Sequence, residues 1–172
     1  MGISYLETKE PKEIIEIWCG GGRNAWALLK KYPESKVTAI DYSEVSVKKA
    51  ASYNNNEIKS WRCIVQHWDV SNLEFPEEKF DLATAFETIY FRPWLDKCFE
   101  QVAKVLKPWA EFLIVNECDW IDKEWLKFEK IIDWMKCYKI EEIEETLKKA
   151  WFSQVKSYRY ENKPWITVLA KK

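Results

Sequence analysis

Residues 14–25 read Ile-Ile-Glu-Ile-Trp-Cys-Gly-Gly-Gly-Arg-Asn-Ala, and this stretch decides the fold. An apolar run ends in an acidic residue and a glycine cluster, and a helix-forming segment follows. Such a run, bounded by turn residues, is typical of a strand that is covered on both faces of a parallel sheet. Glycines allow positive φ and a close backbone approach to a ligand, and the start of the next helix offers unpaired amides. The stretch therefore predicts the entrance of a nucleotide-type cofactor site, with the bulky Trp18 inside it.

Strand and helix signals alternate along the rest of the chain. Strands are predicted at 14–18, 36–41, 63–65, 80–86 and 112–115, followed by a hairpin of 155–160 and 165–170. Helices are predicted at 24–31, from Ser43 onwards, and at 95–106, 125–135 and 140–150. This order predicts an α/β fold of the Rossmann-like type, with a doubly wound, mostly parallel seven-stranded sheet and a C-terminal antiparallel hairpin. No linker or composition break divides the chain, so we expect a single domain over residues 1–172.

Composition limits the partners that the chain can have. Hydrophobic residues make up 47% and charged residues 32% of the chain, and 27 basic against 28 acidic side chains leave a net charge of -1. This balance gives no electrostatic basis for binding nucleic acid. No apolar run reaches the roughly 18 residues of a membrane span, and the first residues lack a secretory pattern. We therefore expect a cytoplasmic protein without a nucleic-acid or membrane partner.

The cysteines and the histidine argue against a metal site. The five cysteines are odd in number and never closely paired, which disfavours a disulfide framework or a zinc knuckle. His67 is the only histidine, so a histidine-rich metal site or a Ser/His triad has little to draw on. We expect no metal, mostly buried cysteines, and a packed or solvated His67.

Functional side chains are expected where the predicted strands end. In a doubly wound sheet, ligands bind beyond the carboxyl ends of the strands, where the strand order reverses. The first strand delivers Glu16 and the glycines, the second ends at Asp41, and the third is followed by Asp69. The fourth strand is followed by a group that comprises Phe86, Glu87 and Tyr90. These residues together predict one site at one edge of the sheet.

The same segments resemble the motifs of class I S-adenosylmethionine-dependent methyltransferases, in particular the small-molecule branch. Residues 16–22 are similar to the family's acidic-x-Gly-x-Gly-x-Gly loop, and residues 106–110, Leu-Lys-Pro-Trp-Ala, are similar to its Leu-Lys-Pro-Gly-Gly turn. The family's second, third and fourth motifs and its Ala-Gly-Phe signature correspond to residues 39–43, 68–75, 80–82 and 150–152. The resemblance covers nearly the whole chain.

The resemblance implies S-adenosyl-L-methionine as cofactor and a small-molecule acceptor. Glu16 and the loop would hold the methionine portion, because a carboxylate suits its ammonium charge. Asp41 would accept from both ribose hydroxyls, since an ionised carboxylate has acceptor oxygens and no competing donor. Asp69 would accept from the adenine amino group. The implied cofactor-binding set is Glu16, Cys19, Gly20, Gly22, Asp41, Tyr42, Asp69, Val70 and Phe86, with Val70 supplying a backbone amide and Phe86 a carbonyl.

A catalytic base is optional in this chemistry. Methyl transfer from a sulfonium is an in-line displacement of an activated reagent, so alignment and desolvation supply much of the rate. Glu87 and Tyr90 are the candidates to orient or deprotonate an acceptor, with packing as the alternative role for Tyr90. Because the first strand begins at about Ile14, we expect almost no N-terminal lid and an open acceptor face.

Tryptophan stands at several positions where the family has glycine. These are Trp18, Trp68, Trp109 and Trp151, and the same replacement is suggested at Trp61 and Trp134. The chain has 11 tryptophans and 4 glycines, whereas an ordinary glycine share would give roughly 12. Independent drift would not favour one replacement, so the pattern indicates an engineered or otherwise altered methyltransferase. We expect Trp18 and Trp68 to fill or reshape the cofactor pocket and to lower its affinity.

Two other functions fit parts of the pattern. Residues 20–25 also satisfy G-x-G-x-x-A, and Asp41 follows about 20 residues later, as in nicotinamide-dependent oxidoreductases. Glu16, Asp69 and the terminal hairpin favour the methyltransferase. The second alternative is a non-catalytic Rossmann-like module in which exposed tryptophans form a contact surface, for example in a homodimer.

Overall fold

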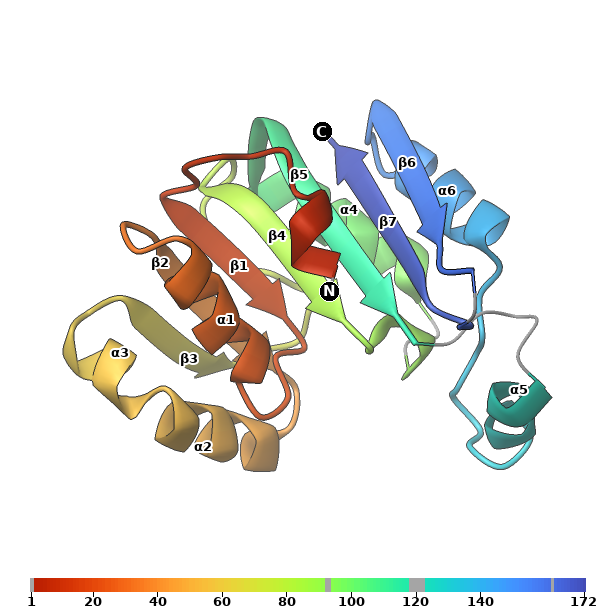
Figure 1. The fold of residues 1–172 in the computed structure, drawn as a ribbon, viewed down its shortest axis with the longest axis horizontal. Helices are drawn as coiled ribbons and strands as arrows, with labels where there is room; N and C mark the ends of the chain where they lie inside the picture. Colours follow the sequence, from red (N-terminus) through yellow and green to blue (C-terminus); the bar gives the residue numbers. More distant parts are fainter. Residues whose placement is uncertain (1, 92–93, 118–122, 162) are drawn as a thin grey trace.

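The computed structural model describes residues 2–91, 94–117, 123–161 and 163–172. Seven strands form one sheet in the order β3-β2-β1-β4-β5-β7-β6 (Figure 1). The strands are β1 (Glu13–Ile17), β2 (Lys36–Asp41), β3 (Cys63–His67), β4 (Phe80–Phe86), β5 (Leu106–Asn116), β6 (Gln154–Arg159) and β7 (Ile166–Lys171). Strands β1 to β5 are parallel, and β7 runs antiparallel to both β5 and β6. The predicted fold class is confirmed.

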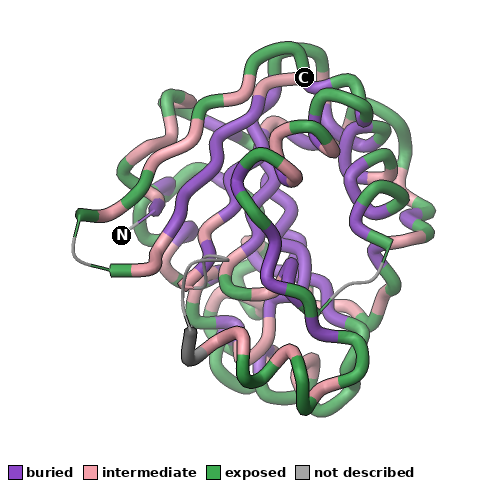
Figure 2. Tube along the Cα trace, turned by 90° about the vertical axis from the view of Figure 1, so that its right-hand side faces the viewer, coloured by how far each residue is buried: buried purple, intermediate pink, exposed green. Residues whose placement is uncertain are grey.

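Helices cover both faces of the sheet. The helical elements are η1 (Gly2–Tyr5), α1 (Arg23–Lys31), α2 (Glu44–Tyr53), α3 (Asn55–Lys59), η2 (Ile89–Phe91), α4 (Leu95–Val105), α5 (Lys123–Glu129) and α6 (Ile140–Lys149). In Figure 1, α1 and α2 lie in front of the sheet, and α4 and α6 lie behind it. The inner strands are therefore buried on both sides, as Figure 2 shows, and Ile14 and Ile15, which point to opposite faces of β1, are both fully buried.

The observed elements differ from the prediction in three places. The helix predicted at 125–135 ends at Glu129, and beyond it Ile131 and Trp134 are exposed, so their apolar character does not reflect a buried helix face. Strand β5 begins at Leu106 instead of residue 112, and a register shift against β4 absorbs the turn at Pro108. The short elements η1, α3 and η2 were not predicted, because three to five residues are too few to show a helical period.

The cysteines agree with the expectation that most of them are buried. Cys19, Cys63, Cys98 and Cys137 are buried and form no disulfide with one another, and Cys118 lies outside the described residues. Within the described ranges, every helix is too short or too polar to cross a bilayer.

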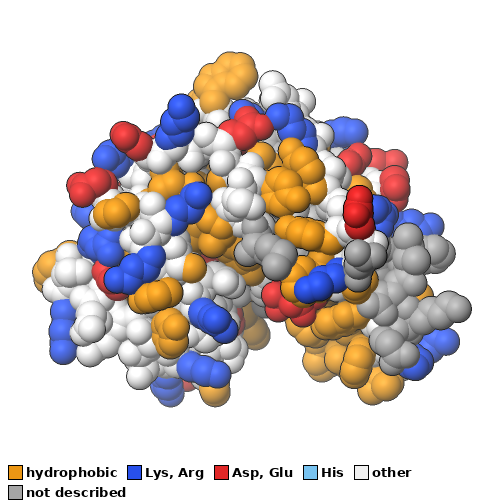
Figure 3. Space-filling model, in the orientation of Figure 1, with side chains coloured by type: hydrophobic (Ala, Val, Ile, Leu, Met, Phe, Trp, Pro, Cys, Tyr) orange, Lys and Arg blue, Asp and Glu red, His pale blue; other side chains and the backbone are white. Residues whose placement is uncertain are grey.

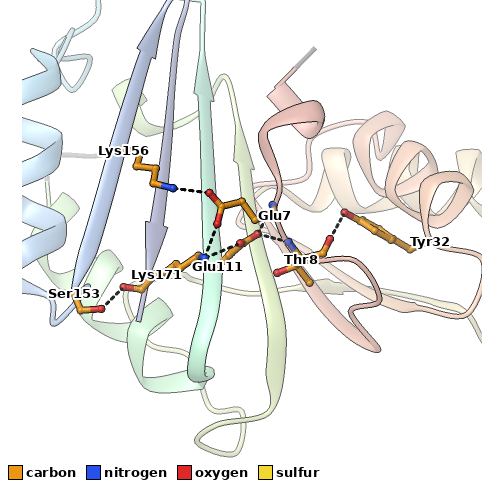
Figure 4. Close-up of polar contacts among 7 residues, drawn as sticks. All are labelled: Glu7, Thr8, Tyr32, Glu111, Ser153, Lys156 and Lys171. Atoms are coloured by element: carbon orange, nitrogen blue, oxygen red, sulfur yellow. Dashed lines mark hydrogen bonds and ion pairs between the residues drawn. The ribbon is translucent and has the colours of Figure 1, made fainter.

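A charged network ties the segment before β1 to the far side of the sheet (Figure 4). The Glu7 carboxylate lies 2.6 Å from Lys156 Nζ on β6 and 2.6 Å from Lys171 Nζ on β7. Glu111, a buried residue of β5, accepts from the backbone amides of Glu7 and Thr8 at 3.1 and 3.0 Å. Hydrogen bonds from Lys156 and then Lys171 lower the pKa of Glu7 to about 2. These ion pairs hold the N-terminal segment on the sheet, and the start of this segment reaches the end of β5, where a Cβ atom built on Gly2 would overlap Val115 Cγ2.

Candidate cofactor site

The carboxyl ends of the parallel strands meet along one edge of the sheet. The strand order reverses between β1 and β4, which is the point where doubly wound sheets bind their ligands. Figure 3, in the orientation of Figure 1, shows the molecular outline hollowed along this lower edge, between the side that carries α2 and the side that carries α5. The predicted site residues are all placed on strands or loops that end here.

Glu16 is a buried carboxyl group with an unmet hydrogen-bonding atom. Its side chain lies on β1 and is 1% exposed, and among the described residues no donor reaches its buried Oε2. Burial, and then the charge of Asp41, raise the pKa of Glu16 well above its ordinary value. Buried polar atoms are normally paired, and an unpaired one calls for an explanation. A donor or cation bound at this edge of the sheet would supply the missing partner.

The glycine loop combines an open face with a packed one. Gly20 and Gly22 have φ of 51° and 79°, a region that favours glycine. A Cβ atom built on Gly20 would meet nothing within 4 Å, whereas a Cβ on Gly22 would lie 2.8 Å from Ala50 Cα of α2. Gly22 therefore allows α1 and α2 to pack closely, and Gly20 leaves its side of the loop accessible to a ligand.

Asp41 connects the glycine loop to the end of β2. It is 7% exposed, and its Oδ2 accepts from the Gly20 amide at 2.8 Å while its Oδ1 accepts from the Ser43 amide at 2.9 Å. Each carboxylate oxygen keeps a further acceptor position for a ligand hydroxyl. The Cys19 amide donates to Ile40 O at 2.9 Å, and burial raises the pKa of the Cys19 thiol. Cys19 thus contributes a neutral, packed side chain and a backbone link.

Asp69, one of the two predicted adenine contacts, lines a cavity together with Tyr42. A cavity of about 490 Å³ is lined by Tyr42, Asp69, Ser71, Phe91, Trp94, Cys98 and Trp134. Asp69 is exposed, and its Oδ1 accepts from the Ser71 amide at 2.8 Å, which orients the carboxylate at the end of β3. Tyr42 is 59% exposed, and its carbonyl lies 2.6 Å from His67 Nε2. Val70, next to Asp69, is buried. The structure thus brings the ends of β2 and β3 to the same space.

The two candidate catalytic residues differ sharply in their surroundings. Glu87 follows β4 with φ 58°, and its amide donates to Val115 O at 2.7 Å. Burial raises the pKa of Glu87, and the nearby carboxylate of Glu117 raises it further. Tyr90 is 4% exposed and packs in a cluster with Met135 and Cys137, which favours the packing role.

Phe86 and Glu117 complete the edge of the sheet. Phe86 ends β4 and pairs with Val115 of β5, so its carbonyl lies at the reversal of strand order. Glu117 was missed in the sequence, although it directly follows β5. The rule that polar residues after strand ends form the site would have found it, had the strand been predicted through Asn116.

The two tryptophans expected to disturb the site occupy different environments. Trp18 has φ 56°, is 4% exposed and belongs to the core cluster that contains Val70 and Leu73. Its indole is therefore packed inside the protein beside the ends of β1 and β3. Trp68 stacks on Phe75 at 5.0 Å and is not among the described non-glycine residues with positive φ. The backbone at Trp68 does not require glycine, but its side chain does line a second cavity, of about 360 Å³, beside Asp69.

Comparisons with known sequences show which family the chain belongs to. A family model described as "Methyltransferase domain" matches residues 14–109. A sterol 24-C-methyltransferase of Aspergillus fumigatus is 25% identical over 104 residues, which is 60% of this chain and 27% of that protein. A demethylmenaquinone methyltransferase of Desulfitobacterium hafniense is 25% identical over 166 residues, or 92% of this chain and 60% of that protein. The chain thus spans 27% and 34% of the length of two sterol methyltransferases that it matches, those of Aspergillus fumigatus and Arabidopsis thaliana.

Solved structures show the same fold. The methyltransferase bound to the Haloferax volcanii Trm112 activator has a TM-score of 0.84 at 16% identity, over 99% of this chain and 86% of that one. A Haemonchus contortus phosphoethanolamine N-methyltransferase, solved with S-adenosyl-L-methionine, has a TM-score of 0.80 at 16% identity, over 98% and 50% of the two chains. The family model covers more than half of this chain, from β1 through the start of β5. The chain belongs to the methyltransferase-domain family.

Proposed function

We propose that this chain binds S-adenosyl-L-methionine at the carboxyl edge of its sheet and transfers the methyl group to a small, largely apolar acceptor. The observation that carries the proposal is the buried, unpaired Oε2 of Glu16 beside the open face of Gly20. The methionine ammonium would give this carboxylate a cationic partner, which the described residues do not provide. The family match favours this interpretation over a nicotinamide-dependent oxidoreductase.

The residues along the edge fit the three portions of the cofactor. Glu16 and the loop suit the methionine portion, and the free acceptor positions of Asp41 suit the ribose hydroxyls. The cavity between Tyr42 and Asp69 suits adenine, with an aromatic face on one side and a carboxylate acceptor on the other. The cofactor supplies an activated methyl group on a sulfonium. The protein supplies alignment and exclusion of water.

Glu87 is the proposed acid–base residue near the acceptor. Its raised pKa lets it hold or accept a proton closer to neutral pH than an ordinary carboxyl group does, which suits general acid–base work. Its backbone is fixed by the hydrogen bond to Val115 O, so the side chain starts from a defined point at the end of β4. Tyr90 supports the neighbouring loop through packing.

An apolar acceptor is favoured by the names of the relatives. The relatives named for sterol, demethylmenaquinone and fatty acid act on molecules with large apolar parts. A homodimer through exposed aromatic residues stays a prediction.

Asp41→Ala is expected to weaken the binding of S-adenosylhomocysteine by about 10- to 100-fold, because charged hydrogen bonds to the ribose hydroxyls contribute about 1.5–3 kcal/mol. Calorimetric titration measures the affinity for S-adenosylhomocysteine, both in the chain that has Trp18 and in the Trp18→Gly variant. Glu44→Ala is the matched control, since Glu44 lies close to Asp41 in the sequence, at the first position of α2, and pairs with Lys48 on the surface. Unchanged affinity after Asp41→Ala, or binding of NADH without binding of S-adenosylhomocysteine, would contradict the proposal.

A further inference from the structure

Four tryptophans adopt a backbone conformation that suits glycine. Trp18, Trp61, Trp109 and Trp151 have φ of 56°, 60°, 67° and 66°. They make up four of the six non-glycine residues with positive φ in the described part of the chain. Only a few per cent of non-glycine residues adopt this conformation, and Asn, Asp and His are the enriched types, whereas bulky residues there are outliers. The steric preference alone would not select tryptophan.

Trp61 and Trp151 occupy the same position in two helix ends. After α6, the Trp151 amide donates to Lys148 O at 3.2 Å and the Phe152 amide donates to Leu147 O at 3.1 Å. After α3, the Trp61 amide donates to Ile58 O at 3.0 Å and the next amide donates to Glu57 O at 2.9 Å. Both patterns are Schellman motifs, in which the residue that must be left-handed is usually glycine. Tryptophan stands at that residue in both.

Trp109 and Trp18 lie in turns that also require a residue with positive φ. Trp109 follows Pro108, and proline followed by a residue with positive φ is the central pair of a type II turn, where glycine normally takes the second place. Trp18 stands between β1 and the glycine loop, at the first glycine of the acidic-x-Gly-x-Gly-x-Gly pattern. Two helix ends and two other turns, at four separate places in the fold, therefore share one substitution.

We infer that the cell that makes this protein inserts glycine at positions 18, 61, 109 and 151, because the codon at these positions is UGA and is decoded there as glycine. UGA is the codon that some genetic codes read as tryptophan and others as glycine, so a single reassigned codon produces one replacement at many unrelated sites. The excess of 11 tryptophans over 4 glycines has the same origin.

Trp165 shows what an authentic tryptophan looks like in this chain. Its indole packs edge-to-face on the Tyr160 ring, with the two ring centroids 6.0 Å apart. Lys163 Nζ lies over the indole, 3.9 Å from the indole centroid. It is half-buried in the β6–β7 hairpin, and it is not among the described residues with positive φ. We expect UGG at this position.

The consequence for the cofactor site falls on position 18. With glycine there, the loop after β1 reads Glu-Ile-Gly-Cys-Gly-Gly-Gly, and the space now filled by a buried indole opens beside the ends of β1 and β3. This consequence rests on the proposed function, whereas the decoding at positions 61, 109 and 151 does not, because those turns lie outside the proposed cofactor-binding residues.

The codons in the gene and the mass of the natural protein test the inference together. Tryptic peptides of the protein purified from its own cells should contain glycine in residues 13–23 and 150–156, and tryptophan in the control peptide of residues 160–171. The gene should carry UGA at the four positions and UGG at 165. UGG codons with tryptophan-containing peptides at 18 or 151 would overturn the inference, and so would glycine at 165. Neither readout depends on cofactor binding, so failure of the proposed function would leave the result intact.

Discussion

Replacing Trp61, Trp109 and Trp151 together by glycine should raise the melting temperature by about 6–12 °C, the shift that about 3 kcal/mol produces in a domain of this size. Each tryptophan holds a left-handed backbone that costs on the order of 1–3 kcal/mol for a residue with a Cβ. Glycine removes this cost but adds about 0.5–1 kcal/mol of unfolded-state entropy. The net gain is therefore about 1 kcal/mol at each position.

Loss of buried side-chain surface does not cancel the expected gain in stability at these three positions. The side chains of Trp61, Trp109 and Trp151 are 82%, 75% and 71% exposed, so truncation forfeits little hydrophobic stabilisation. Trp18 is different, since it is 4% exposed and loss of a buried aromatic side chain costs about 3–5 kcal/mol. Trp18→Gly should therefore lower the stability of the unliganded protein and should recover it when a ligand fills the space.

Trp134→Gly is the matched control for the triple variant. Trp134 is 63% exposed but is not among the described residues with positive φ, so glycine relieves no strain there and leaves stability equal or slightly lower. Differential scanning calorimetry compares the melting temperatures of the starting chain, the triple variant, Trp18→Gly and Trp134→Gly. A triple variant no more stable than the starting chain would contradict the claim that the left-handed backbone at these three tryptophans is strained.

Glu16→Gln should stabilise the unliganded protein while weakening cofactor binding. The folded pKa of Glu16 lies well above its ordinary value of 4.5. Between these two pKa values the folded state binds more protons than the unfolded state, so the stability of the starting chain falls as pH rises. Glutamine carries no such penalty, and the difference should reach about 1–3 kcal/mol at pH 8 and vanish below pH 4. The affinity for S-adenosylhomocysteine should fall by about 10- to 100-fold, because the ammonium loses a charged acceptor.

Glu111→Gln provides the contrast for this prediction. Glu111 is also 1% exposed, but its Oε2 already accepts from two backbone amides, so amide substitution should destabilise the protein. Urea unfolding at pH 5 and pH 8 measures both variants. If Glu16→Gln destabilised the unliganded protein at pH 8, Glu16 would have an internal partner, and its assignment to a ligand would be wrong.

The sheet and its ligand edge were predictable because both follow from short-range patterns. Mainly apolar runs such as Val37–Ile40 and Leu82–Phe86 identify strands buried on both faces, and the parallel order brings Asp41 and Asp69 to one edge of the sheet. The helix predicted at 125–135 was wrong beyond Glu129, since apolar residues on an exposed turn mimic a helical face.

The backbone at the tryptophans could be predicted only in part. Family motifs flagged Trp18, Trp109 and Trp151 correctly, and the suggestion at Trp61 is also confirmed by its φ. Trp68 and Trp134 do not share this conformation, so their backbone gives no support for glycine at these two positions. The packing of Tyr90 depended on residues far along the chain, such as Met135, and no local pattern reveals such a contact.

The central claim is that Glu16, the glycine loop and Asp41 form a cofactor site that residue 18 controls. Calorimetric titration of S-adenosylhomocysteine into the Trp18→Gly protein tests it most directly. We predict a dissociation constant of about 1 μM or better, near -8 kcal/mol, and binding weaker by at least about tenfold in the chain with Trp18. Absence of binding to a folded Trp18→Gly protein, or equal affinity in the two chains, would contradict it.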